Sequence, residues 1–406
     1  MREQLMTMLE ERKEEMIEIR RYLHQYPELS FKETNTAKFI AAFYEGKGVE
    51  IERNVGNGYG IVVTIKGEKP GKTIALRADF DALAIKEETD VPFKSKNEGV
   101  MHACGHDGHT AYLMVLADCL IQLKSSLPGT IKIIHQHAEE ISPGGAKSIL
   151  DSGILDDVDH IFGAHLMPNE PAGTIGCNSG YTMAGRSSFK LGIQGAGGHG
   201  SSPHLANDPI VAGAHFITAI QTIISRRLNP FDTGVITVGS FDGKGARNVI
   251  KDRVELEGDA RYMSDETRET IESEMHRIVK GVEAEFGVEC DFLYESDYPP
   301  LYNHPEITEF VKTSLEKTDD PDIKQVIEFP KFSGSEDFAY YLEKIPGTFF
   351  FIGCKPSGVE KVYFNHHPKF DMDEESLLVA AKSVGEVVCC YFEQNCSQIG
   401  ETVEMS

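Results

Sequence analysis

The sequence predicts an α/β protein in which a second, α+β domain is inserted into the first. Its 406 residues exceed what one ordinary compact core holds and suit two domains. Towards both ends of the chain, short β-branched runs alternate with helical stretches, which is typical of a largely parallel sheet covered by helices. The middle of the chain instead shows the order β-α-β-β-α-β, which indicates an independent ferredoxin-like unit.

The outer α/β domain begins with an amphipathic helix over residues 2–26, where apolar residues recur at helical spacing. The further elements expected before the insertion are strands at 61–65, 73–76 and 130–135 and a helix at 109–124. After residue 300 the same pattern resumes, with a strand at 348–352 and a helix at 374–392.

The inserted unit is predicted from four strand-like and two helical segments. These are strands at 189–194, 234–241, 254–262 and 289–294 and helices at 209–226 and 266–286. We therefore divide the chain into a discontinuous α/β domain (1–183 and 298–392), an inserted domain (184–297) and a polar tail (393–406).

Composition excludes several classes of function. The chain carries 64 acidic and 40 basic residues, a net charge of −24, which repels nucleic acid and anionic lipid. No apolar run approaches the roughly 20 residues of a membrane span, and residues 1–21 lack the apolar core of a signal peptide. Eight irregularly spaced cysteines are too few for a disulfide scaffold. We expect a cytoplasmic protein without nucleic-acid or membrane partners.

The densest group of reactive side chains is His102-Ala103-Cys104-Gly105-His106-Asp107-Gly108-His109. A thiolate and an imidazole two positions apart, on a loop before a helix, can reach one metal ion or a pair of ions. The alternative is a surface loop in which Asp107 or Thr110 caps the helix. The density of candidate ligands favours the metal-binding interpretation.

A pair of carboxylates, Glu139 and Glu140, follows the strand that ends near His135. Residues just beyond the carboxyl end of a strand in an open α/β sheet face the ligand crevice. One carboxylate there can bind a cation while the other acts as a general base. Without this location, paired glutamates would be read as solvated charges.

Two further histidine segments complete the candidate site. His165 ends the apolar run 161–164, and His366 and His367 lie in the segment 364–368. Together with the earlier groups they supply sulfur, nitrogen and oxygen donors at strand ends or loops. This donor set is sufficient for two divalent ions.

The order of these motifs resembles that of the M20 family of metallopeptidases. The sequence Leu-Arg-Ala-Asp-Phe-Asp-Ala-Leu (76–83) comes first, followed by the motifs at 102–109, 137–140, 163–165 and 366–371. The resemblance extends over residues 15–390 and is strongest to the aminoacylase, hippurate hydrolase and auxin-conjugate amidohydrolase branch. It implies a metal-dependent amidohydrolase that cleaves small N-acyl-amino acids. Two ions per chain are implied, Mn²⁺ or Zn²⁺, with Co²⁺ or Ni²⁺ also possible.

The resemblance also assigns roles to individual positions. Glu139 would be the general base that takes a proton from the attacking water and returns it to the leaving amine. In the inserted domain, which would be a lid and dimerisation domain, His199 would polarise the scissile carbonyl and Asn248 would lie near the substrate. In some relatives the histidine acts across a dimer interface, so a homodimer or higher homo-oligomer is expected. The metal ligands would be Cys104, as the bridging ligand, and His106, Glu140, His165 and His366.

The sequence departs from the family pattern at several positions. Asp79 lies in an Arg-Ala-Asp sequence where the wider family has His-x-Asp, so we do not assign it as a ligand. His137 replaces a common proline, and His366 is preferred over His367 because it occupies the motif position. Two alternatives remain: a di- or carboxypeptidase of the same family, and a catalytically silent metal-binding partner protein.

Overall fold

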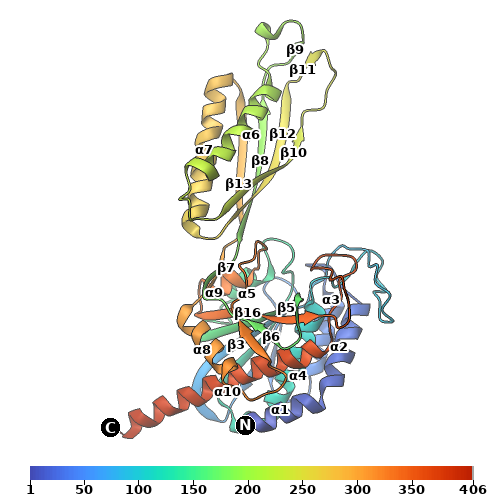
Figure 1. Cartoon of the computed structure of the whole chain (residues 1–406), viewed down its shortest axis with the longest axis vertical. Coiled ribbons are helices and arrows are strands. Elements are labelled where there is room, and N and C mark those ends of the chain that lie inside the picture. Colours follow the sequence, from blue (N-terminus) through green and yellow to red (C-terminus); the bar gives the residue numbers. More distant parts are fainter. Residues whose placement is uncertain (405–406) are drawn as a thin grey trace. The chain divides into compact units, whose positions relative to one another are not determined.

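The computed structural model describes the backbone of residues 1–404 and the side chains through residue 394 (Figure 1). The chain forms two compact units. The large unit holds Met1–Gly180, Tyr302–Pro330 and the chain from Tyr340 onward, and the inserted unit holds Tyr181–Leu301 and Lys331–Ala339. The predicted fold class, an α/β domain interrupted by an α+β domain, is confirmed. The return of residues 331–339 to the inserted unit was not predicted.

An eight-stranded mixed sheet forms the centre of the large unit. Strands β3, β4, β5 and β16 run parallel to their neighbours in this group, whereas β1, β2 and β6 form antiparallel pairs. The sheet is therefore less uniformly parallel than the sequence predicted. In spatial order the strands are β1 (Glu50–Val55), β2 (Gly60–Lys66), β4 (Pro128–Gln136), β3 (Lys69–Asp79), β5 (His160–Pro171), β16 (Gly347–Lys355), β6 (Thr174–Gly176) and β15 (Gln325–Ile327).

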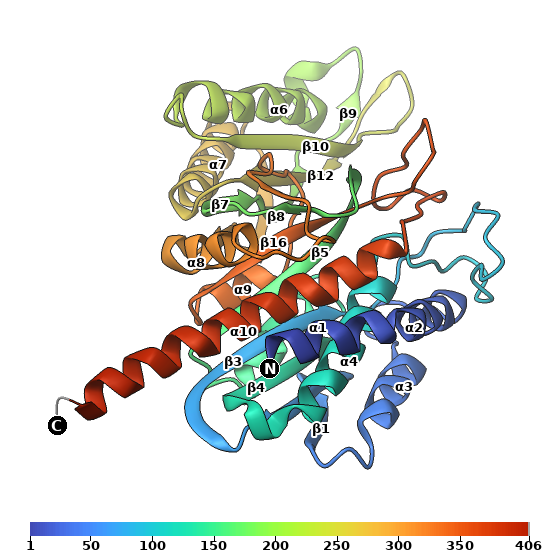
Figure 2. The same ribbon diagram turned by 60° about the horizontal axis from the view of Figure 1, so that its bottom comes forward.

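Helices α1, α2, α4 and α10 lie together along the large unit in Figure 2 and share one hydrophobic core with the sheet. Every residue of α4 except Gln122 is buried, so this helix is the centre of that core. The helices of the chain outside the insertion are α1 (Arg2–Glu11), α2 (Lys13–Gln25), α3 (Thr34–Tyr44), α4 (His106–Gln122), η1 (Lys124–Ser126), α5 (Gly145–Asp151), α8 (Pro305–Glu316), α9 (Phe338–Leu342) and α10 (Glu375–Glu404).

Two ends of the chain differ from the sequence prediction. The single helix expected over residues 2–26 is divided at Arg12, whose backbone (φ −107°, ψ 13°) leaves the helical region. At the other end, the segment 393–406 that we expected as a polar tail continues α10 through Glu404, and residues 405 and 406 lie outside the described residues. Among the described helices, none is long and apolar enough to cross a membrane.

The inserted unit has the predicted β-α-β-β-α-β order. Its four-stranded antiparallel sheet has the spatial order β10-β12-β8-β13, and α6 and α7 share a hydrophobic core with it. A small ribbon of β9 and β11 belongs to the same unit. The bounds are β7 (Gly180–Met183), β8 (Gly185–Gln194), β9 (Gly198–His199), η2 (Pro203–Leu205), α6 (Pro209–Arg226), β10 (Gly234–Asp242), β11 (Val249–Ile250), β12 (Arg253–Tyr262), α7 (Asp265–Phe286), β13 (Glu289–Tyr298) and β14 (Leu301–Asn303).

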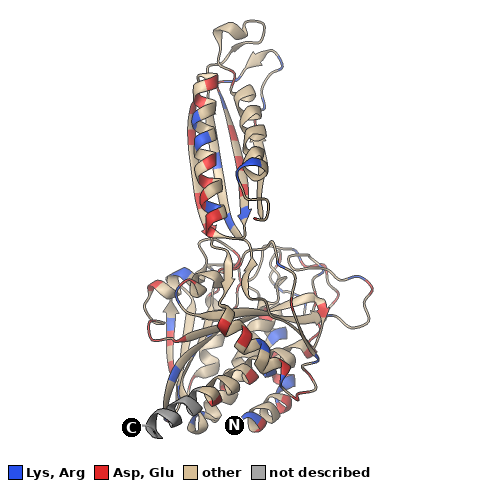
Figure 3. Cartoon of the chain, turned by 60° about the vertical axis from the view of Figure 1, so that its left-hand side comes forward, with Lys and Arg blue, Asp and Glu red and all other residues tan. Residues whose placement is uncertain are grey.

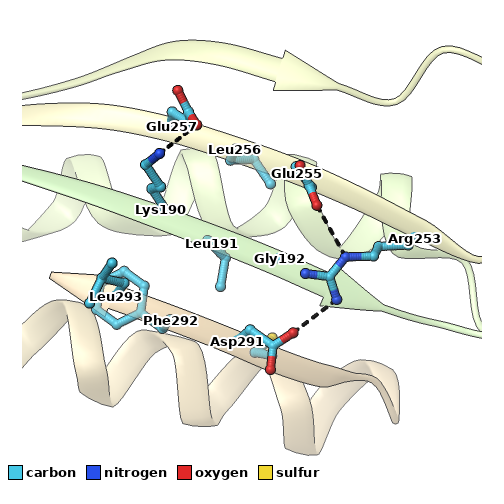
Figure 4. Close-up of a pocket in the computed structure, with 11 residues that line it drawn as sticks. Lys190, Leu191, Gly192, Arg253, Glu255, Leu256, Glu257, Asp291, Phe292 and Leu293 are labelled. Atoms are coloured by element: carbon cyan, nitrogen blue, oxygen red, sulfur yellow. Dashed lines mark hydrogen bonds and ion pairs between the residues drawn. The ribbon is translucent and has the colours of Figure 1, made fainter.

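One face of the inserted sheet carries charged side chains that pair with one another (Figure 4). Arg253 lies 2.9 Å from Asp291 and 3.3 Å from Glu255, and Lys190 lies 3.2 Å from Glu257. These residues surround a cavity of about 640 Å³. The charged groups that line this cavity are therefore paired with one another.

Candidate metal-binding and catalytic site

The parallel strands bring the predicted site residues to one edge of the large sheet. Asp79 ends β3 and pairs with Gln136 at the end of β4, three residues before Glu139. His165 lies in β5, two residues beyond Gly163, which pairs with Arg77 of β3. The carboxyl ends of neighbouring parallel strands meet at the same sheet edge, so segments far apart in the sequence converge there.

Five predicted donor residues form one cluster at this edge. The Sγ atom of Cys104 lies 3.5 Å from Nε2 of His165, and Oε1 of Glu140 lies 3.2 Å from Nε2 of His366 and 3.8 Å from Nε2 of His106. Within the groups Cys104–His106–His165 and Cys104–Glu140–His366, the donor atoms all lie within 4.8 Å of one another. The structure therefore brings together all five side chains that the sequence predicted as ligands.

Glu139 lies beside this cluster. One of its carboxylate oxygens is within 4.8 Å of donor atoms of His106 and Glu140, and the residue is only 6% exposed. The chain turns sharply just before it, because Ala138 has a left-handed backbone conformation (φ 51°). The Ala138 N–H donates to Oε1 of buried Glu33 at 2.8 Å, which stabilises the turn that presents both glutamates.

Asp81 orients two members of the cluster, a role that the sequence analysis missed. Nδ1 of His106 lies 3.1 Å from Oδ1 of Asp81, so Nε2 faces the other donors. The second oxygen of Asp81 accepts the Glu140 N–H at 3.0 Å and the Ser30 hydroxyl at 2.7 Å. Such contacts fix the tautomer and direction of a ligating imidazole. The available signal was the second aspartate of the sequence at 76–83.

The electrostatics of the cluster suit divalent cations. Burial, assisted by His109, holds the pKa of His165 well below its usual value, so this imidazole is neutral, as a metal ligand must be. Burial opposes charge on His106, but Asp79, Asp81 and Cys104 outweigh it and raise its pKa. Hydrogen bonds to Cys104 and Glu140 raise the pKa of His366 to about 10. Negative groups thus favour positive charge at the point where the donors meet.

A fit to metal ions is also supported by an unsatisfied donor atom. Nε2 of His106 is buried and has no hydrogen-bond partner among the described residues. A buried polar atom without a partner is costly unless something binds it. Cys104, His106, Glu140, His165 and His366 together provide the thiolate, imidazole and carboxylate donors that Zn²⁺ and related ions prefer.

The other residues of the sequence motifs lie outside the cluster or have different partners. Asp79 is held by His109 and Arg77. His102 is buried, which lowers its pKa to about 4, and His137 packs against Phe31 with its ring centroid 5.9 Å away.

His367 also points to another environment than His366. Its ring packs against Tyr363 in a tilted arrangement with the centroids 4.4 Å apart, and its Nδ1 accepts the Lys369 N–H at 3.0 Å. Neither contact involves a residue of the donor cluster. Of the two histidines, His366 is thus the one that lies in the donor cluster.

The two predicted residues of the inserted unit are neighbours. His199 in β9 pairs with Val249 of β11, and the Gly200 N–H donates to the carbonyl oxygen of Asn248 at 2.8 Å. Both His199 and Asn248 are exposed. The His199 ring is held by the Ser201 hydroxyl, 2.7 Å from Nδ1. The ribbon of β9 and β11 therefore brings the backbones of these two exposed residues close together.

One known protein family matches most of the chain. The family model described as Peptidase family M20/M25/M40 matches residues 75–389. The chain belongs to this peptidase family. It is a metal-dependent hydrolase, as the sequence predicted.

Three relatives cover almost the whole chain. YhaA of Bacillus subtilis (strain 168), whose name assigns it provisionally to the amidohydrolases, is 47% identical over 94% of this chain and 95% of its own length. N-acetyl-L-cysteine deacetylase of the same organism is 40% identical over 90% and 86%. Thermostable carboxypeptidase 1 of Saccharolobus solfataricus is 39% identical over 93% and 96%.

Two solved structures share the fold. A protein of methicillin-resistant Staphylococcus aureus, described provisionally as an aminohydrolase, is 54% identical with a TM-score of 0.93, over 97% of this chain and 100% of its own. The YXEP protein of Bacillus subtilis is 35% identical with a TM-score of 0.81, over 94% and 98%. YXEP is described as a dinuclear metal-binding peptidase of the M20 family.

Proposed function

We propose that this chain hydrolyses the amide bond of small N-acyl-amino acids to a carboxylate and a free amino acid, using two divalent metal ions. The observation that carries the proposal is the convergence of sulfur, nitrogen and oxygen donors beside Glu139. The deacetylase relative supports this substrate class, whereas the carboxypeptidase relative supports peptides as the alternative. The ligands would be Cys104, His106, Glu140, His165 and His366.

Glu139 would carry the proton through the reaction. Two divalent ions, when bound, supply Lewis acidity and lower the pKa of water towards neutrality. Glu139 takes a proton from the water as its oxygen adds to the amide carbon. It returns that proton to the nitrogen as the C–N bond breaks, so the amine leaves neutral and the acyl group leaves as a carboxylic acid, which then loses its own proton to water and becomes a carboxylate. Such general acid–base transfer contributes typically about 10²–10⁴-fold.

The donor set suits several divalent ions. Imidazole and carboxylate donors accept Mn²⁺ or Zn²⁺, and Co²⁺ or Ni²⁺ could replace them, while a thiolate favours the softer ions. A ligating Cys104 must stay reduced, which is consistent with the cytoplasm as the site of action.

The inserted domain would act as a lid. His199 would polarise the scissile carbonyl and Asn248 would contact the substrate. Their adjacency on one ribbon supports a joint role, because any movement of the ribbon carries both side chains together.

A homodimer through the inserted domain is part of the proposal. Acidic and basic residues are spread along α7, whereas Arg226 is the only charged residue of α6 (Figure 3). α6 exposes Val211 (52%), and β10, an edge strand, exposes Val235 (51%). An uncharged helix face beside an open strand edge suits a twofold contact.

Light scattering tests this contact. Val211→Glu should convert the dimer to monomers at micromolar concentration, whereas Glu269→Lys on the exposed side of α7 should not. A wild-type protein that is monomeric, or a dimeric Val211→Glu protein, would count against the α6 face.

The hydrolytic activity is tested by amine release from a panel of acetyl-, benzoyl- and longer acyl-amino acids and dipeptides. Metal-stripped protein is compared with protein to which Mn²⁺ or Zn²⁺ has been restored. We expect metal-dependent release from acyl-amino acids, faster than from dipeptides. Faster release from dipeptides would favour the peptidase alternative.

The variant Glu139→Gln tests the proposed role of Glu139 as the general base. It should bind as much metal as the wild type, measured by mass spectrometry of the metal content, and lose at least about 10²-fold in kcat. No release from any substrate by metal-loaded wild type would favour the silent partner protein instead.

A further inference from the structure

A side-chain amide contacts the thiol of Cys104 from a distant part of the chain. Nδ2 of Asn365, in the loop between β16 and α10, lies 3.5 Å from Sγ of Cys104 and 3.2 Å from the Cys104 carbonyl oxygen. A carboxamide nitrogen carries two hydrogens. One can therefore be donated to the sulfur while the other is donated to the main chain of the same residue.

The loop that carries Asn365 is also attached by its backbone. The His366 N–H donates to the Ala103 carbonyl oxygen at 2.7 Å, and the Phe370 N–H donates to the His367 carbonyl oxygen at 2.8 Å. The first bond holds the loop against the segment before α4 and the second closes a turn within the loop, and neither uses the Asn365 side chain. The loop is thus attached by its backbone even without the contact between the Asn365 amide and the sulfur.

The amide differs chemically from the other groups around the sulfur. His165 Nε2 is equally close, at 3.5 Å. An imidazole nitrogen that binds a metal ion does so through its lone pair and cannot donate a hydrogen bond at the same time. The Asn365 N–H groups do not titrate, so they remain donors to the sulfur whatever the imidazoles do.

We infer that Asn365 is a positioning residue that tunes the Cys104 thiolate by donating an N–H···S hydrogen bond. The inference rests on the proposed role of Cys104 as a metal ligand. A hydrogen bond to a ligating thiolate withdraws charge from the sulfur and lowers the energy of its lone-pair electrons. The second N–H of Asn365, bound to the Cys104 carbonyl oxygen, fixes the direction of the Asn365 side chain. Loss of such a supporting contact typically weakens metal binding about 10–100-fold.

The test uses Co²⁺-loaded protein, because a cobalt-bound thiolate gives a charge-transfer absorption band in the near ultraviolet. In Asn365→Leu, which is similar in size but has no donor, we expect this band at longer wavelength and Co²⁺ binding about tenfold weaker. Asn365→Ala provides a second variant should the leucine disturb the loop. His367→Ala is the matched control, because it changes the same loop without touching Cys104, and its band should stay in place.

The outcomes separate the inference from the proposal beneath it. A wild-type band that does not move in either Asn365 variant overturns the inference and leaves Cys104 as a ligand. Weaker binding with an unmoved band would mean that Asn365 only holds the loop, and also overturns it. The absence of any thiolate band in the wild type overturns the ligand role of Cys104, and the inference with it.

Discussion

His109 bridges Asp79 and the backbone of β5 with both of its ring nitrogens. Nδ1 lies 2.6 Å from Oδ1 of Asp79, and Nε2 accepts the Leu166 N–H at 3.0 Å. Burial lowers the pKa of His109, which agrees with a neutral ring that donates at Nδ1 and accepts at Nε2. Neither nitrogen is then available to a metal ion. His109 instead fixes the main chain immediately after His165.

Asp79→Asn should destabilise the protein without removing a metal ion. Burial would raise the pKa of Asp79, but Arg77, His106 and His109 hold it well below its usual value, so the residue is a buried carboxylate. An amide cannot accept from both Arg77 and His109, and breaking a buried ion pair costs about 3–5 kcal/mol. Urea unfolding should detect this loss, while metal content stays at the wild-type value.

The matched control for Asp79→Asn is Asp118→Asn. Asp118 forms an ion pair with Arg12 at 2.7 Å. It lies in α4, twelve residues after His106 and therefore about 18 Å from the end of the helix that carries the site residues. Its substitution should be milder because this pair is partly exposed. A reduced metal content in Asp79→Asn alone would show that Asp79 is a ligand after all.

His366→Ala and His367→Ala should separate the two adjacent histidines. Adding Mn²⁺ or Zn²⁺ to stripped wild-type protein should raise Tm, because a ligand at 100 times its Kd stabilises the folded state by about 2.7 kcal/mol. His366→Ala should lose most of this gain, whereas His367→Ala should keep it. The measurement is a thermal melt at several metal concentrations. Equal loss in both variants would contradict the assignment of His366.

Mixing two inactive variants should show in which chain His199 acts. Glu139→Gln lacks the proposed base and His199→Ala lacks the proposed carbonyl donor, so each alone should be nearly inactive. If His199 acts across a dimer, one site of the mixed dimer has both groups intact, and activity should return on mixing. If it acts within its own chain, the mixture should stay inactive. Subunit exchange is checked by mass spectrometry of the native complex.

Helices and strands whose apolar residues recur at a regular spacing were predictable from the sequence, and the inserted unit is the best example. The predicted helix at 209–226 matches the bounds of α6, and the strand predicted at 234–241 ends one residue before β10 does. Both are amphipathic, so the spacing of apolar residues along the sequence shows which face is buried. The break at Arg12 was missed because the apolar spacing continues through it.

The donor set was predictable because its residues cluster in short motifs, whereas their supporting contacts were not. Asn365 and Cys104 are 261 positions apart, and Asp81 and Glu140 are 59 apart. Their approach depends on which strands are neighbours and in what register, which no local pattern encodes. The sequence likewise could not show that Nε2 of His106 lacks a hydrogen-bond partner in the described part of the chain, whereas both ring nitrogens of His109 are hydrogen-bonded.

Glu33 provides a prediction about pH. Burial, with a contribution from nearby Asp81, raises the pKa of Glu33 to about 8 from its ordinary 4.5. Between these values the unfolded chain loses the proton while the folded chain keeps it. The stabilising contribution of protonated Glu33 is therefore fully present below pH 4.5 and is lost as the pH rises to about 8.

Glu33→Gln should therefore be more stable than the wild type at pH 8 and equally stable at pH 4.5. Glutamine keeps an oxygen for the Ala138 N–H but cannot ionise, so it avoids burying a charge. We expect a gain of about 4 kcal/mol at pH 8, since the pKa of Glu33 is raised from 4.5 to about 8 and each pKa unit corresponds to about 1.4 kcal/mol. Thermal melts across this pH range measure it, with Glu52→Gln on the exposed side of β1 as the control. A Glu33→Gln protein less stable at pH 8 would mean that the turn at Ala138 needs an ionised carboxylate.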